Sequence, residues 1–116
     1  MALSEDLPVY KVTVKLLDRL TDLQPNLPRM VRYHHGDQMI DICIDMLVLI
    51  RDANRSADKQ AFLDQLLSKQ HRLLLILRVC FRQKAFSTGK YAELLEPLES
   101  IGKQVTQWRK KSKSNG

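Results

Sequence analysis

Apolar residues recur at intervals of three and four along four segments of the chain, which is the spacing of one helix face. We predict helices at 8–23, 37–53 and 58–84, and a fourth helix from Ser87 or Thr88 to Trp108. The connections between them are short. This pattern predicts an all-α protein, an up-down-up-down four-helix bundle over residues 1–108, with the second and third helices as its most buried pair.

The predicted first helix has clear start and stop signals. Pro8 is preorganised for the first helical position, and Asp6 is close enough to cap or favour the N-terminus. Pro25 and Pro28 end the helix, because proline lacks an amide donor and disfavours helical geometry in the preceding residue. Residues 29–37 then form a short basic connection, in which Gly36 provides an unusual backbone angle or a close contact.

The two most apolar runs are expected to be covered on more than one side. Ten of the twelve residues from Met39 to Ile50 are apolar, so this helix is central in the bundle or lies in an oligomer interface. The run is too short to span a membrane and contains two aspartates. Eight of the nine residues from Leu73 to Phe81 are apolar, which also predicts burial on several sides.

The fourth helix carries an anomaly and is followed by a basic tail. Pro97 removes an amide donor and crowds the carbonyl of Glu93, so we expect a kink or break there. Residues 109–116 are predicted to be a disordered tail, serving as a solubilising end or an electrostatic arm.

The formal net charge of +6 is placed unevenly along the sequence. Residues 1–57 contain seven Lys and Arg against eight Asp and Glu, whereas residues 58–116 contain twelve against five. This asymmetry suggests a polyanion or an acidic protein as the partner. The candidate binding residues are the cations of the second half: Arg72, Arg78, Arg82, Lys84, Lys103, Arg109, Lys110 and Lys111.

These cations also have a purely structural interpretation. For Arg78 we expect an ion pair with an aspartate of helix 37–53, because a buried charge needs a partner. Among the aromatic residues, Trp108 is expected to complete the core, while both core packing and base stacking stay open for Tyr33.

No catalytic or metal site is expected. Asp41 and Asp45 lie one helical turn apart, but no nucleophile or orienting group completes a site around them. The histidines and cysteines lack the spacing of structural zinc ligands, and no phosphate-binding glycine loop is present, so we expect no cofactor.

Cys43 and Cys80 lie in apolar runs, which predicts buried, reduced thiols. With no export signal visible, the expected location is the cytoplasm.

Several short motifs, in order, resemble one bacterial family. They are Leu7-Pro8-Val9-Tyr10, Arg32-Tyr33-His34-His35-Gly36, Ala53-Asn54-Arg55, Leu77-Arg78, and Ile101-Gly102-Lys103-Gln104 followed by Trp108. The family comprises four-helix-bundle accessory variability proteins of diversity-generating retroelements (Avd-like) and proteins encoded in intervening sequences of large-subunit ribosomal RNA genes. Pro97 and the pair His34-His35 depart from its pattern.

The resemblance implies a homopentameric barrel that binds RNA or DNA without sequence specificity and, in retroelement members, associates with the reverse transcriptase during mutagenic copying of a template RNA. Two alternatives stay open. In the first, the chain is an rRNA intervening-sequence protein of ribosome-related or unknown role. In the second, it is a structural oligomer without affinity for nucleic acid.

Overall fold

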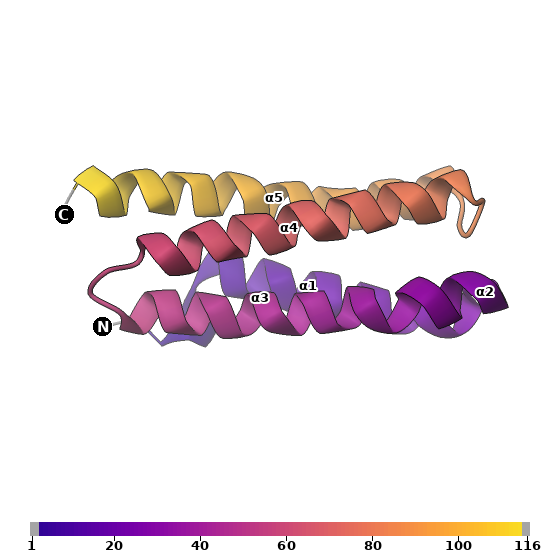
Figure 1. The fold of residues 1–116 in the computed structure, drawn as a ribbon, viewed down its shortest axis with the longest axis horizontal. Coiled ribbons are helices and arrows are strands. Elements are labelled where there is room, and N and C mark those ends of the chain that lie inside the picture. Colours follow the sequence, from indigo (N-terminus) through magenta and orange to yellow (C-terminus); the bar gives the residue numbers. More distant parts are fainter. Residues whose placement is uncertain (1–2, 115–116) are drawn as a thin grey trace.

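The structure, a computed structural model, describes residues 3–114 and is helical along almost all of them. Four long helices form the molecule (Figure 1). In chain order, the elements are the 3-10 turn η1 (Ser4–Asp6), α1 (Pro8–Leu23), the 3-10 turn η2 (Gln24–Asn26), α2 (Arg29–Val31), the π-helical turn η3 (Arg32–Gly36), α3 (Asp37–Arg55), α4 (Gln60–Arg82) and α5 (Thr88–Ser114).

The four long helices pack side by side as an antiparallel bundle, 46 Å long and about half as wide. α1 packs against α3 and α5, and α4 packs against the same two helices from the opposite corner. The core consists of apolar side chains from all four long helices, including the fully buried Leu16, Met46, Leu77 and Ile101. The all-α class and the helical bundle predicted from the sequence are confirmed.

Helix boundaries agree with the prediction for α1, which begins at Pro8 and ends at Leu23. No side chain caps it, however, so the capping role expected of Asp6 is wrong. The start of α5 is as expected, because the Ser87 hydroxyl accepts a hydrogen bond from the Lys90 amide at 3.1 Å. At the start of α4, the Asp58 carboxylate accepts the amide of Gln60.

The expected loop over residues 29–37 is helical instead. After the extended Pro28, α2 begins at Arg29 and passes through the π-helical turn η3 directly into α3. Gly36 has ordinary helical dihedral angles, so of the two roles predicted for it only the close contact is found. A Cβ atom at Gly36 would lie 3.2 Å from the Gln24 side chain, which folds over the turn.

The predicted disordered tail is also wrong for the residues that the structure describes. α5 continues to Ser114, six residues beyond Trp108, while residues 115–116 lie outside the described part of the chain. The extension is held against the start of α4: the Gln60 side chain donates to the Arg109 carbonyl at 3.2 Å, and the Arg109 guanidinium pairs with Asp64 at 2.6 Å. Trp108 packs against the core, as predicted.

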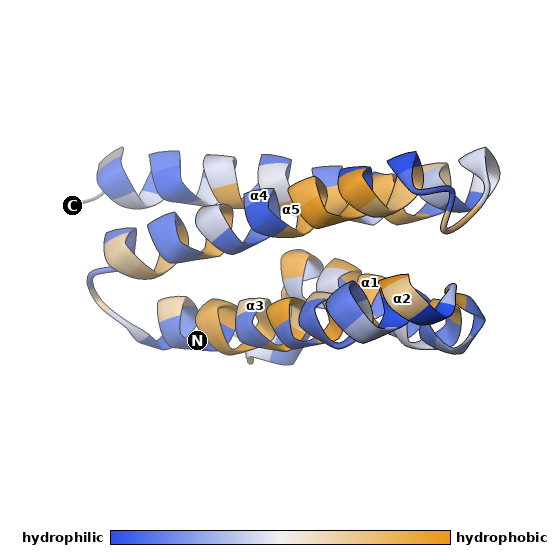
Figure 2. Ribbon diagram, turned by 45° about the vertical axis from the view of Figure 1, so that its right-hand side comes forward, coloured by the Kyte–Doolittle hydropathy of each residue, from blue (hydrophilic) through white to orange (hydrophobic). Residues whose placement is uncertain are grey.

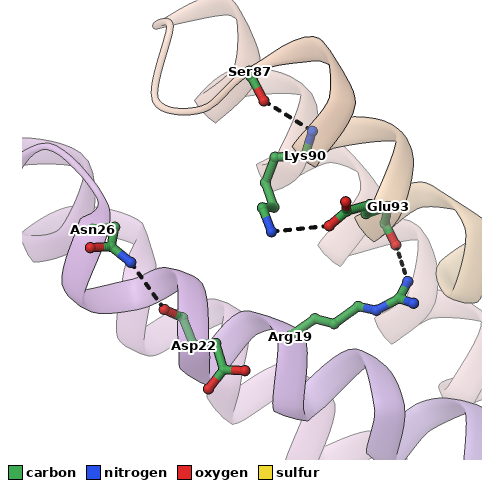
Figure 3. Close-up of polar contacts among 6 residues, drawn as sticks. All are labelled: Arg19, Asp22, Asn26, Ser87, Lys90 and Glu93. Atoms are coloured by element: carbon green, nitrogen blue, oxygen red, sulfur yellow. Dashed lines mark hydrogen bonds and ion pairs between the residues drawn. The ribbon is translucent and has the colours of Figure 1, made fainter.

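Pro97 lies inside α5 without breaking it, contrary to the expected break. Proline has no amide hydrogen, so the Glu93 carbonyl one turn earlier loses its usual donor. The guanidinium of Arg19 on α1 donates to this carbonyl at 2.5 Å and replaces the missing hydrogen bond (Figure 3). A contact between two helices therefore makes an interior proline tolerable.

The Glu93 side chain is anchored in the same place. Its carboxylate accepts a hydrogen bond from the Lys90 ammonium at 3.0 Å, as Figure 3 shows. This hydrogen bond and the charge of Lys90 lower the pKa of Glu93, with a smaller contribution from the Arg19 charge. The cationic groups of α1 and α5 thus converge on both the backbone and the side chain of one residue.

We predict that Arg19 and Pro97 are energetically coupled. Substitution Arg19→Met leaves the Glu93 carbonyl without its donor and should lower the free energy of unfolding by about 1 kcal/mol. In a Pro97→Ala background the new amide can donate to that carbonyl, so the same substitution should cost little. Urea denaturation of the four proteins measures the coupling. Lys15→Met, an exposed position one turn earlier, is the control. Equal costs of Arg19→Met in both backgrounds would contradict the proposed compensation.

Candidate nucleic-acid interface

The outward side of α4 carries a row of exposed residues in which three arginines predominate. It consists of His71, Arg72, Leu75, Arg78 and Arg82, all exposed, and we call it the α4 cationic face. Leu75 lies at its centre, because the other four are three, four or seven residues away and share its side of the helix. Figure 2 shows how strongly apolar this half of α4 is otherwise.

Burial of the apolar run of α4 is less complete than the sequence suggested. Leu73, Leu77 and Cys80 are fully buried, but Leu75 is 46% exposed. On α3, Ile44 and Val48 are 45% and 41% exposed. Both helices are thus covered on more than one side, as predicted, but each keeps an exposed apolar position in the isolated chain. α3 packs against α1 and α4, and α4 packs against α3 and α5. The side of each helix that points away from the bundle core faces outward.

The arginines of the α4 cationic face have no acidic partner within the described residues. The aspartates expected to pair with Arg78 are engaged elsewhere or exposed: Asp45 binds Lys69 at 3.0 Å, Asp52 binds Arg51 at 3.2 Å, and Asp41 faces outward. The ion pair predicted for Arg78 is therefore wrong. Its side chain is hydrated and available to a ligand, because it lies on the outward side of α4.

Lys84 extends this positive charge around the end of α4. It has a left-handed backbone (φ 60°) and forms the C-terminal turn with Ala85, whose amide donates to the Cys80 carbonyl at 3.0 Å. The Lys84 side chain is exposed. Arg72, Arg78, Arg82 and Lys84 are thus four exposed cations on α4 and its C-terminal turn, and we treat them as one group.

The predicted cations of α5 lie apart from that group. Lys103, Lys110 and Lys111 are exposed, whereas Arg109 is held by Asp64. Since α4 and α5 are antiparallel, Lys110 lies at the end of the bundle opposite Lys84 (Figure 1). The structure therefore does not bring the eight predicted residues into a single patch.

Lys103 and Lys111 flank an apolar groove between the start of α1 and the second half of α5. The groove has a volume of about 410 Å³ and is lined by Leu7, Pro8, Val9, Lys103, Gln104, Gln107, Trp108 and Lys111. These two lysines therefore belong to surroundings that differ from the open α4 cationic face.

Three residues outside the predicted set also belong to the cationic surface. Arg29, Arg32 and Tyr33 line a pocket at the end of the bundle where α4 finishes. The sequence described this segment as a short basic connection and left base stacking open for Tyr33, but the predicted binding residues all lay in the second half of the chain. Helical structure in α2 and η3 fixes the positions of these side chains.

Cys43 and Cys80 are buried thiols of low reactivity. Burial raises the pKa of Cys43 to about 12 and that of Cys80 to about 11, so both are protonated near neutral pH. They form no disulfide.

Within residues 3–114, no group of three or more His, Cys, Asp and Glu side chains is placed to hold a metal ion.

None of the helices in the described part of the chain combines the length and the apolar character needed to cross a membrane. Comparisons with protein-family models, with curated proteins and with solved structures give no match.

Proposed function

We propose that this protein binds nucleic acid through its phosphates and catalyses no reaction itself. The observation that carries the proposal is the α4 cationic face, where three arginines are exposed and none has an acidic partner in the described structure. Unpaired surface cations release condensed counterions when they neutralise phosphates, which supplies sequence-independent affinity. Lys84 adds a fourth cation to the same surface.

The cellular role that we propose rests on the family resemblance of the sequence motifs. In this proposal the protein is an accessory factor of a diversity-generating retroelement, located in the cytoplasm, and it associates with the reverse transcriptase and with template RNA or its cDNA. The helical bundle is compatible with that role. The alternative is an rRNA intervening-sequence protein of ribosome-related or unknown role, and a reverse transcriptase gene with a template repeat beside the coding sequence would decide for the retroelement.

We also propose that the chain assembles into a homo-oligomer. The motivation is the outward side of α3, where Ile44 and Val48 are exposed one turn apart. Five copies is the number that the resemblance implies. Light scattering that returned the 13.5 kDa mass of a single chain at micromolar concentration would contradict the assembly.

The nucleic-acid proposal is tested by the salt dependence of binding. If Arg72, Arg78, Arg82 and Lys84 each contact one phosphate of a DNA duplex, the logarithm of the association constant should fall with the logarithm of salt with a slope of roughly −3 to −4. Raising salt from about 50 to 200 mM should then weaken binding roughly 100-fold. Fluorescence anisotropy with a labelled duplex measures this. Absence of binding at low salt would favour the structural-oligomer alternative, and affinity that salt leaves unchanged would contradict binding through phosphates.

A further inference from the structure

A pocket at one end of the bundle is lined by an aromatic ring and two arginines. It is formed by the connection from α1 to α3 and has a volume of about 590 Å³. Its lining residues are Gln24, Pro25, Arg29, Arg32, Tyr33 and Asp37, and we call it the Tyr33 pocket. Nothing in the function proposed above uses it, since that function needs only phosphate contacts.

Tyr33 has little structural role in the isolated chain. Its side chain is 81% exposed, the largest exposed fraction among the large apolar and aromatic residues that the structure describes. The π-helical turn η3 buries Gly36 and leaves Tyr33 outside. The one ring beside it in the described structure is that of His34, perpendicular to it with the centroids 5.2 Å apart. Its aromatic surface is therefore available to a ligand. Isolated π-helical turns occur frequently at functional sites.

The charged groups of the pocket favour an anionic ligand. The Arg29 side chain has no hydrogen bond or ion pair within the described residues, and the Arg32 side chain donates one long hydrogen bond, 3.4 Å, to the Pro25 carbonyl. The one acidic group, Asp37, accepts a short hydrogen bond from the Gln24 amide. Two available guanidinium groups thus accompany one carboxylate that already has a partner.

The Tyr33 pocket also lies at the end of the bundle where α4 finishes. α3 and α4 are antiparallel neighbours, so the start of α3 lies beside the end of α4 (Figure 1). Arg82 and Lys84 therefore occupy the same end of the bundle as Tyr33. A strand bound to the cations of α4 can reach the pocket without crossing the molecule.

We propose that the Tyr33 pocket binds an unpaired base of a single-stranded nucleic acid. In this arrangement the base stacks on the Tyr33 ring, and Arg29 and Arg32 contact the adjacent phosphates. Stacking on an aromatic side chain requires a free base face, which a continuous duplex does not offer. Because every base has such a face, the pocket is indifferent to sequence. This inference rests on the proposed function and adds to it a preference for single-stranded segments.

The test compares Tyr33→Ala with Tyr33→Phe, using a labelled single-stranded RNA and the same RNA annealed to its complement. Losing one stacked base costs about 1–3 kcal/mol, so Tyr33→Ala should weaken single-strand binding roughly 5-fold to 150-fold. Tyr33→Phe keeps the ring and should bind like the parent. Both variants should bind the duplex like the parent. The control Leu3→Ala removes another exposed apolar side chain, 62% exposed, near the opposite end of α3 and should change neither affinity.

Each outcome separates this inference from the proposed function. Unchanged single-strand affinity of Tyr33→Ala overturns the stacking site and leaves the α4 cationic face intact, with a protein as the remaining partner for Tyr33. Equal weakening of both probes, or a Tyr33→Phe variant as weak as Tyr33→Ala, also overturns stacking. A parent protein that binds neither probe overturns the proposed function, and the stacking site with it. Photocrosslinking of a 5-iodouridine-containing strand to the peptide that holds Tyr33 would support the site directly.

Discussion

Reversing two charges on α4 is expected to weaken nucleic-acid binding roughly 100-fold, about tenfold for each phosphate that is no longer neutralised. The variant is Arg78→Glu with Arg82→Glu. Both side chains are exposed and unpaired in the described structure, so reversal replaces attraction to phosphate with repulsion. The slope of the salt dependence should become shallower by nearly one unit for each of these phosphates. Anisotropy titrations at several salt concentrations measure both quantities.

The chain offers a matched control for this variant. Lys11 and Lys15 on α1 are also exposed, one turn apart and without a described ion pair. They lie on the helix diagonally opposite α4. Both double reversals lower the formal net charge from +6 to +2, because each substitution changes the charge by two. Lys11→Glu with Lys15→Glu should therefore change affinity only through general charge, by less than about threefold.

Equal weakening in the two double variants would contradict a localised interface and would indicate attraction by net charge alone. Folding should not complicate the comparison, because exposed charges without partners contribute little to stability. Circular dichroism and urea midpoints should be close to those of the parent for both variants. Charge reversal at Arg78 by itself should also leave stability unchanged, since this residue neutralises no buried carboxylate in the described structure.

A large loss of stability is expected from Leu77→Ala in α4. Leu77 is fully buried, and truncating such a leucine typically costs about 3–5 kcal/mol through lost transfer free energy and the cavity left behind. Leu75, two residues away and 46% exposed, is the matched control. Leu75→Ala should cost less than about 1 kcal/mol, because much of its side chain stays in water in the folded chain.

Urea denaturation of the two variants at low protein concentration gives both values. A small cost for Leu77→Ala would contradict the packing of the core. A cost for Leu75→Ala comparable to that for Leu77→Ala would show that Leu75 is covered in solution. Repeating the measurement on the assembled form, if light scattering detects one, would then identify the covering surface as a second copy of the chain.

Local signals in the sequence placed most of the helix boundaries. The first helix was predicted to the residue, because Pro8 favours its start and Pro25 and Pro28 prevent its continuation. The second agrees at its start and extends two residues further at its end, to Arg55. The third was predicted two residues too long at each end, since the Asp58 carboxylate and the left-handed Lys84 end it earlier.

The errors have a common cause, which is that the deciding partner lies on another helix or another turn. Pro97 was expected to break α5, but Arg19 of α1 donates to the carbonyl that Pro97 leaves unpaired. The C-terminal extension of α5 is stabilised by Asp64 and Gln60 of α4. Spacing along the sequence cannot identify Arg19 as the partner of Glu93, or Asp64 and Gln60 as the partners of Arg109.

The candidate site was predicted only in part. The sequence identified the cations of α4 as candidates, because charge asymmetry is visible without a fold. It did not show which of them are free, since that depends on whether the aspartates of α3 face Arg78 or Lys69. It also did not place Tyr33, whose exposure depends on the π-helical turn between α2 and α3.

For this protein, the sequence by itself determined the helical class, most helix limits and the excess of positive charge in the second half. These properties follow from hydrophobic period, proline chemistry and composition, all of which act locally. Only the tertiary structure decided which arginines stay unpaired, that Pro97 lies in a continuous helix, and that Leu75 and Tyr33 face outward. The continuity of α5 depends on the hydrogen bond from Arg19 of α1, and the exposure of Tyr33 depends on the π-helical turn. The unpaired arginines and the exposure of Leu75 depend on the rotation of one helix against its neighbours, because a few tens of degrees exchange a buried, partnered position for a hydrated one.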